Sequence, residues 1–181
     1  MIQLKTNRLL IRDYMISDLD DIHKWMSDPE VMHYLDWKTT TIEETKKDLL
    51  DTIKEIGNPN RKTYFFAIIE KDTQNHVGGA GFTIRSKQNN SGIGEFGYFL
   101  LKDYWGKRIA VEVVSRIIKF AFMELKLHKL TASCDKENMA SERVMQKCGL
   151  IKEAELRKEK FHRNKWCDRL QYSILIDDWK K

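Results

Sequence analysis

The spacing of apolar residues changes several times along the chain, and each change marks the border of a predicted element. Runs rich in branched and aromatic residues predict strands over 4–12, 64–70, 76–84, 93–101, 129–134, 151–161 and 166–176. Helical spacing predicts helices over 18–26, 42–56, 109–124 and 138–147. In the third of these the stripe consists of Ala110, Val113, Val114, Ile117, Ile118, Ala121 and Phe122. This order of seven strands and four helices predicts an α/β (α+β) fold with a mixed central sheet.

Residues that favour caps and turns support these borders. Ser17 and Thr41 are predicted N-caps of the first two helices, and Asn138 opens the last, with Gly149 at its C-terminal end. The strand over 76–84 carries three glycines, which predicts a bulge or the close approach of another backbone.

Length and composition describe one compact unit. At 181 residues, with 41% hydrophobic and 33% charged, the chain is predicted to be a single domain over 1–181. No apolar run is long enough to cross a membrane, and Met1–Arg8 contains no apolar segment of a secretion signal. The three cysteines have no paired spacing, so we expect free thiols and a cytoplasmic protein.

The net charge is +5, with an isoelectric point near 9.0, which raises the question of a nucleic-acid partner. Acidic residues are mixed among the basic ones, and the densest basic stretch, 157–165, reads as a solvated hairpin. Neither an RNA-binding aromatic motif nor a helix-turn-helix spacing is present, so nucleic acid is not the expected ligand. The histidines lack the spacing of metal ligands, so no metal is expected.

A basic, glycine-containing loop over 102–108 connects a predicted strand to the predicted helix over 109–124. The first turn of a helix has backbone N–H groups without partners and the positive end of the helix dipole. Such a turn binds anions, most often phosphates, and Lys107 and Arg108 add cationic side chains at the same point.

Four segments in this order resemble the GNAT superfamily of acyl-CoA-dependent N-acetyltransferases, and more narrowly the branch that includes the ribosomal-protein N-terminal acetyltransferases. They are Thr6-Asn-Arg8-Leu-Leu-Ile-Arg12; Ser27-Asp-Pro-Glu-Val31 with Tyr34-Leu35; Gly97-Tyr98 with Tyr104-Trp-Gly-Lys and Ala110-Val-Glu112; and Asn138-x-x-Ser141-x-x-Val144-x-x-Lys147-x-Gly149-Leu150 with Glu153, Asp168 and Trp179. The resemblance implies acetyl-CoA as co-substrate, an amine acceptor, and a sheet that splays at the CoA cleft.

The resemblance also implies the residues that bind CoA. The diphosphate loop would be Trp105, Gly106, Lys107, Arg108, Ile109 and Ala110, and Arg108 departs from the family pattern because glycine is usual there. The pantetheine arm would run along Phe99, Leu100 and Leu101, beside a bulge or splay of the strand. Asn138 would contact pantetheine, and Ser141 would lie near the thiol or toward the 3′-phosphate ADP side of the arm.

Acetyl transfer to an amine needs a neutral amine, an oxyanion donor and a proton for the departing thiolate. Glu95 is the first candidate for the base, although a carboxylate on an exposed strand has the same appearance in the sequence. Glu159 is a second candidate, with pairing to Lys158 or Lys160 as the alternative. Ser141 is the candidate proton donor, or else only the third residue of a capped helix. No cysteine has the surroundings of a nucleophile, which favours direct transfer.

The acceptor is expected to contact the helices over 17–56, the loop over 33–41 and the final hairpin. Candidate lining residues are Tyr34, Trp37, Phe161 and Trp166, and candidate acids are Asp28, Glu30 and Asp36. A peptide N-terminus, a polyamine, an amino acid and an aminoglycoside-like amine all remain open. A non-catalytic acyl-CoA-binding regulatory module of the same fold is the alternative function. Pairing of two copies through the C-terminal strands is a hypothesis for a homodimer.

Overall fold

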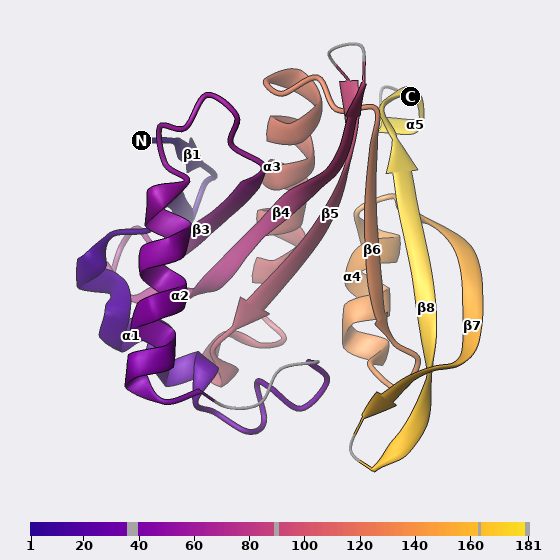
Figure 1. The fold of residues 1–181 in the computed structure, drawn as a ribbon, viewed down its shortest axis with the longest axis horizontal. Helices are drawn as coiled ribbons and strands as arrows, with labels where there is room; N and C mark the ends of the chain where they lie inside the picture. The colour runs from indigo at the N-terminus through magenta and orange to yellow at the C-terminus, as the bar shows by residue number, and fades with distance from the viewer. Residues whose placement is uncertain (36–39, 89–90, 163, 180–181) are drawn as a thin grey trace.

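The computed structural model describes residues 1–35, 40–88, 91–162 and 164–179 (Figure 1). In this part of the chain one mixed sheet of eight strands forms the centre, in the order β1-β2-β3-β4-β5-β6-β8-β7. The strands are β1 (Gln3–Lys5), β2 (Leu9–Asp13), β3 (Thr63–Glu70), β4 (His76–Gln88), β5 (Ser91–Leu100), β6 (Lys129–Asp135), β7 (Ile151–His162) and β8 (Lys165–Leu175). Every neighbouring pair is antiparallel except β5 and β6.

Helices cover both faces of the sheet (Figure 1). They are α1 (Leu19–Met26), α2 (Ile42–Lys54), α3 (Ile109–Met123), α4 (Met139–Lys147) and α5 (Ile176–Trp179), with short 3-10 turns η1 (Ile16–Asp18) and η2 (Lys102–Tyr104). Successive residues of a strand point to opposite faces. Accordingly Phe66 and Ile68 of β3 join the core beneath α3, whereas Ala67 and Ile69 join the core beneath α1 and α2.

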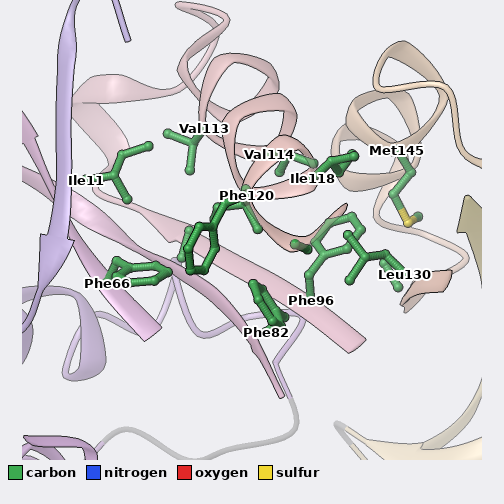
Figure 2. Close-up of a cluster of buried hydrophobic side chains, with 14 of the residues drawn as sticks. Ile11, Phe66, Phe82, Phe96, Val113, Val114, Ile118, Phe120, Leu130 and Met145 are labelled. Carbon is green, nitrogen blue, oxygen red and sulfur yellow. The ribbon is translucent and has the colours of Figure 1, made fainter. Parts of the chain in front are cut away.

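The larger core lies between α3, α4 and the sheet (Figure 2). The predicted apolar stripe of α3 is the reason, since all of its members except Ala110 are buried. Phe120 of the same helix packs its ring edge-on against Phe66 at 5.9 Å. Burial of this stripe fixes the helix, and so fixes the loop that precedes it, against the sheet.

The first predicted strand proved to be two. Thr6 closes a tight turn after β1, where its hydroxyl accepts the N–H of Leu9 at 2.9 Å, and β2 then pairs back on β1. This turn accounts for eight strands instead of about seven, and the single turn α5 adds a fifth helix. The first helix begins differently from the prediction: it starts at Leu19 after η1, and its N-cap residue is Asp18, not Ser17. The Asp18 side chain makes no capping bond to α1 and instead accepts the N–H of Met15 at 2.8 Å.

The other caps are as predicted. The Thr41 hydroxyl accepts the N–H of Glu44 at 3.2 Å, and the Glu44 carboxylate accepts the N–H of Thr41 at 2.8 Å. This reciprocal capping box begins α2. Gly149 follows α4 with φ +84°, the left-handed conformation that ends a helix.

The glycines of β4 permit close contact with both neighbouring strands. A Cβ on Gly78 would lie 2.0 Å from the Phe99 carbonyl oxygen, and one on Gly81 would lie 2.0 Å from the Tyr64 carbonyl oxygen. The β3–β4 register also shifts between Ile68 and Ile69, which is a bulge. The predicted bulge and the predicted close approach therefore both occur in β4.

The sheet parts between β5 and β6. Their ladder consists of Ile93–Lys129, Gly94–Leu130 and Glu95–Thr131, although both strands continue well beyond it. Figure 1 shows the two strands diverging toward the end where β5 leads into η2. The predicted splay is therefore present, and it leaves the ends of β5 and β6 facing an opening.

The remaining global expectations concern thiols and membranes. Cys134, Cys148 and Cys167 are all free, as predicted. Among the described residues no helix is long and apolar enough to span a membrane. The same residues contain no group of three or more His, Cys, Asp or Glu placed to hold a metal ion.

Candidate functional site

The backbone of β5 offers hydrogen-bonding groups to the opening beside it. The Leu101 N–H donates to the Val77 carbonyl of β4 at 2.9 Å, whereas the Gly92 carbonyl accepts the His128 N–H at 2.8 Å on the other side. The sides alternate along a strand, so Phe96, Tyr98 and Leu100 turn their backbone polar groups toward the gap. Phe99 and Leu101 turn theirs toward β4.

The loop before α3 lies at the end of this gap. Its φ is +72° at Gly106 and +60° at Arg108, and Lys107 between them is not among the residues with positive φ. Alternating signs of φ direct successive N–H groups into one concavity, a geometry that binds anions. Arg108 is the N-cap of α3, and its side chain does not cap the helix. Arg108 thus adopts the left-handed conformation that glycine adopts without steric cost, and glycine is the residue that the family resemblance implies at this position.

The loop is tied back to β5 by an aromatic side chain. The Trp105 indole N–H donates to the Leu100 carbonyl at 2.8 Å. Lys107 places its ammonium 5.3 Å from the centre of the Tyr104 ring. The path of the loop is thereby fixed relative to the last residue of the strand.

The gap and the loop belong to one cleft with a volume of about 840 Å³. It is lined by the segment 29–35, by the ends of β5 and β6, by the loop before α3, and by α4. Of the residues predicted from sequence to bind CoA, those that line the cleft are Phe99, Leu100, Trp105, Gly106, Arg108, Ile109, Ala110, Asn138 and Ser141. Leu101 and Lys107 are adjacent to the lining but outside it.

Ser141 faces the cleft from the first turn of α4. The Asn138 side chain accepts the Ser141 N–H at 3.0 Å, so Asn138 is the N-cap, and the Ser141 hydroxyl is not needed for capping. Tyr98 of β5 lines the same cleft as Ser141. Burial raises the pKa of Tyr98 to about 12, although the neighbouring Ser141 hydroxyl opposes the rise. Tyr98 is therefore protonated at neutral pH.

The thiols near the cleft are not activated. Cys134 lines the cleft from β6, and burial, together with the Glu142 charge, raises its pKa to about 11. Burial also raises the pKa of Cys148, although a hydrogen bond with Ser115 opposes the rise. A thiol with a raised pKa is mostly protonated at neutral pH and is a poor nucleophile.

The two carboxylates predicted as bases lie outside the lining of the cleft. Glu95 forms an ion pair with Arg85, with 2.6 Å between Oε2 and Nη2, and its side chain is 38% exposed. Glu159 is exposed on β7, within a register shift between Leu156 and Lys160. The backbone N–H of Lys158 in this shift donates to Asp168 at 2.9 Å.

The segment over 29–35 borders the cleft on the side where the acceptor was expected, and Tyr34 is part of its lining. Glu30 pairs with Lys102 of η2. The His162 ring nitrogen Nε2 lies 3.0 Å from the His33 carbonyl oxygen, which connects the segment to the tip of the β7–β8 hairpin. The segment is thus tied to both sides of the gap.

Other predicted acceptor residues have different positions. Phe161 and Trp166 pack edge to face at 5.5 Å on the hairpin tip, each more than half exposed, and neither lines the cleft. Asp28 lies beside the lining, where its carboxylate accepts the Glu30 N–H at 2.8 Å. The predictions for Asp36 and Trp37 concern residues outside the described part of the chain.

Sequence reasoning missed several groups in and below the cleft. Arg169 of β8 lines the cleft and donates to the Ser133 hydroxyl at 2.6 Å. No motif marked either residue, because cross-strand neighbours are set by the register of the sheet. Arg8 lies in one of the four segments that carry the family resemblance, but no role was predicted for it.

Comparison with known proteins agrees with this geometry. The family model described as the GNAT acetyltransferase domain matches residues 8–151. The uncharacterized N-acetyltransferase p20 of Bacillus licheniformis is 31% identical over 175 residues, which cover 95% of this chain and 95% of that protein.

Two solved structures share the fold. One is the ribosomal-protein-S5-alanine acetyltransferase of Vibrio fischeri, with 24% identity, a TM-score of 0.84 and 100% of each chain covered. The other is the spermidine N-acetyltransferase of Vibrio cholerae in complex with CoA and spermine, with 21% identity and a TM-score of 0.84. The latter match covers 97% of this chain and 100% of that one.

Proposed function

The chain belongs to the GNAT family of acetyltransferases, and on this premise we propose that it moves the acetyl group of acetyl-CoA directly to a primary amine while both substrates are bound. One observation carries the proposal: the gap between β5 and β6 opens into the same cleft as the positive-φ loop before α3. Acetyl-CoA supplies the activated acetyl group, and this chain's residues bind, orient and donate protons.

We assign the diphosphate of CoA to the loop over 106–110. The N–H concavity around Lys107 and the first turn of α3 both attract a doubly charged anion. Arg108 adds an exposed guanidinium at the lining of the cleft. The residue that departs from the family pattern would therefore contact phosphate instead of blocking it.

The pantetheine amides would pair with the backbone of β5 in place of a neighbouring strand. The alternation of the strand supports Tyr98 and Leu100 as the residues that contact it through N–H groups, with Phe96 contributing its carbonyl. Phe99 and Leu101, which the sequence also suggested, direct their backbone groups to β4 and would contribute by position only. Asn138 keeps its amide N–H₂ for the same arm, since only its oxygen caps α4.

For the chemical step, we propose that the Ser141 hydroxyl gives a proton to the departing thiolate and regains one, through water, from the amine nitrogen, which loses a proton as the amide forms. The amine must lose its own proton before attack. An α-amino group has a pKa of about 8, so a large fraction is neutral at mildly basic pH without a strong base. Glu95 and Glu159 lie outside the lining, so each would act only through intervening water.

We propose a peptide N-terminus as the acceptor, rather than a polyamine. Of the carboxylates in the described lining, Glu30 pairs with Lys102, and Asp135 accepts the Glu137 N–H at 2.8 Å. A polycation needs several carboxylates, and this cleft offers more basic than acidic side chains. The ribosomal-protein acetyltransferase among the solved structures acts on the class of acceptor proposed here, and the spermidine enzyme acts on the alternative.

The first experiment is calorimetric titration with acetyl-CoA and CoA, followed by an assay of CoA release with an alanine-terminated peptide and with spermidine. Gly106→Pro should weaken binding at least tenfold, since proline cannot adopt φ +72°. Gly57→Pro is the matched control, because Gly57 also has positive φ, at +83°, but lies in an exposed turn. It should leave the affinity unchanged.

The outcomes separate the alternatives. Faster release with the peptide than with spermidine supports the proposal, and the reverse order replaces the peptide by a polyamine. Binding of CoA without turnover of any amine favours a regulatory acyl-CoA-binding module. No binding at millimolar concentration of either ligand would overturn the assignment of the cleft.

A further inference from the structure

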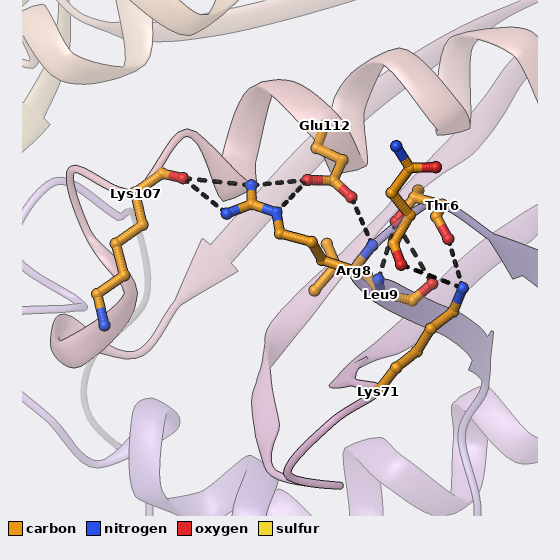
Figure 3. Close-up of polar contacts among 7 residues, drawn as sticks. Thr6, Arg8, Leu9, Lys71, Lys107 and Glu112 are labelled. Carbon is orange, nitrogen blue, oxygen red and sulfur yellow. Dashed lines mark hydrogen bonds and ion pairs between the residues drawn. The ribbon is translucent and has the colours of Figure 1, made fainter.

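Arg8 connects the turn after β1 with the loop before α3, although the two are far apart in sequence (Figure 3). Its guanidinium donates from both Nη1 and Nη2 to the Lys107 carbonyl, each at 3.2 Å. The same guanidinium pairs with Glu112 of α3, with Nε at 2.8 Å and Nη2 at 2.6 Å from Oε2. Neither Arg8 nor Glu112 lines the cleft, so a direct contact with substrate does not explain this arrangement.

The peptide bond between Lys107 and Arg108 is trans, as no cis bond occurs among the described residues. In a trans peptide the carbonyl and the following N–H point in opposite directions. Since Arg8 holds the Lys107 carbonyl on its own side, the Arg108 N–H points away from Arg8, and Gly106 and Arg108 line the cleft whereas Arg8 does not. The opposite orientation of this peptide would present a carbonyl oxygen to the anion.

Arg8 also neutralises an acid in the helix turn that follows the proposed anion site. Glu112 lies in the first turn of α3, and its backbone N–H donates to the Arg108 carbonyl at 3.3 Å. Partial burial would raise the pKa of Glu112, but hydrogen bonds from Thr6 and Arg8 outweigh it, and the net pKa is lowered. The carboxylate is therefore charged at neutral pH, and without Arg8 it would repel a phosphate nearby.

We propose that the Arg8–Glu112 pair is a positioning device: it fixes the peptide between Lys107 and Arg108 with its N–H toward the diphosphate of CoA. The inference rests on the proposed function, since it presumes that CoA occupies the loop. Arg8 is 48% exposed, so the pair contributes little to global stability and its variants should fold. The effect should appear in binding of the diphosphate.

The test compares the affinities of CoA and of pantetheine, which lacks the diphosphate, for wild type and for Arg8→Met, Arg8→Lys and Glu112→Gln. Arg8→Met should weaken CoA about tenfold and leave pantetheine unchanged, as expected when a charged hydrogen bond is lost. Arg8→Lys should restore only part of the affinity, because an ammonium lacks the fork that reaches both Lys107 and Glu112.

Lys71→Met is the matched control. Lys71 donates to the Thr6 carbonyl at 2.5 Å, so it supports the same turn from the other side without reaching the loop (Figure 3). This variant should lower the melting temperature without altering the preference for CoA.

The two proposals fail in different ways. Wild type that binds CoA no more tightly than pantetheine overturns the diphosphate site itself, and the positioning role with it. Wild type that prefers CoA, with an unchanged preference in folded Arg8→Met and Glu112→Gln, overturns the positioning role alone.

Discussion

Asn138 accepts the backbone N–H of Ser141 at 3.0 Å, which separates the capping of α4 from the hydroxyl of Ser141. The cap and the proposed proton donor are therefore different groups, although both belong to the first turn of the helix. A change at the hydroxyl can be made without unravelling the helix, and this makes the catalytic role of Ser141 accessible to a clean test.

Ser141→Ala should lower kcat about a hundredfold, the usual contribution of a positioned proton donor, and leave the affinity for CoA unchanged. Steady-state kinetics with the best amine acceptor measures this. Ser115→Ala removes a hydroxyl from α3, where Ser115 is exposed and outside the lining, and should have no effect. An unchanged kcat in Ser141→Ala would reduce Ser141 to a structural residue of α4.

Arg108→Gly should stabilise the fold by up to about 1 kcal/mol, because glycine adopts φ +60° without steric strain. The same change should weaken CoA about tenfold through loss of the guanidinium. Lys126→Gly provides the comparison, since Lys126 has φ +57° and lies outside the lining of the cleft. It should be stabilised similarly and keep its affinity; equal affinities in both variants would contradict a phosphate contact by Arg108.

Asp13→Asn should cost about 3–5 kcal/mol in urea unfolding, because it removes the partner of a buried cation. The Asp13 and Arg61 side chains are 0% and 5% exposed, and the pair spans 2.8 Å. Arg61 also lies 4.6 Å from the centre of the Tyr64 ring, so it cannot turn to solvent without losing that contact.

Asp51→Asn breaks a pair of nearly the same length, 2.7 Å to Lys54, between exposed side chains on α2. No change in unfolding should be measurable there. Similar losses in the two variants would mean that burial does not govern these ion pairs.

Stability should fall as the pH drops below about 6.5, in part because of His76. Burial lowers the pKa of His76, although Asp18 and Asp21 oppose this and Arg12 and Lys24 add to it. Neither ring nitrogen has a hydrogen-bond partner in the described structure. The unfolded chain therefore binds a proton at a higher pH than the folded chain does, and stability present at pH 7 is lost on acidification.

His76→Leu removes this proton uptake. Melting temperatures between pH 5 and 7.5 should decline less steeply in the variant than in wild type. Parallel curves would show that other groups determine the acid limb.

Local periodicity and caps were readable from the sequence because they depend on neighbours a few residues apart. The stripe of α3 and the Asn138 cap are examples, and both are found as predicted. The turn at Thr6 was missed, since a hydroxyl accepting one N–H interrupts a run that otherwise reads as a single strand.

Contacts between segments that are far apart in the sequence could not be predicted from it. Arg8 and Lys107 are 99 residues apart, and the packing of α3 against β1 brings them together. Likewise, Glu95 meets Arg85 across a register shift in β4, a local irregularity without a sequence signature. A motif could therefore indicate which residues lie near the cleft, whereas the contacts of those residues could be identified only from the folded sheet.

In the described part of the chain, the short ladder between β5 and β6 divides the sheet into two parts that are hydrogen-bonded to each other only along this ladder. A pantetheine arm whose amides pair with β5 would act as a strand of the sheet as well as a ligand of the cleft. Binding of such a ligand would therefore extend the β5 side of the sheet by one strand.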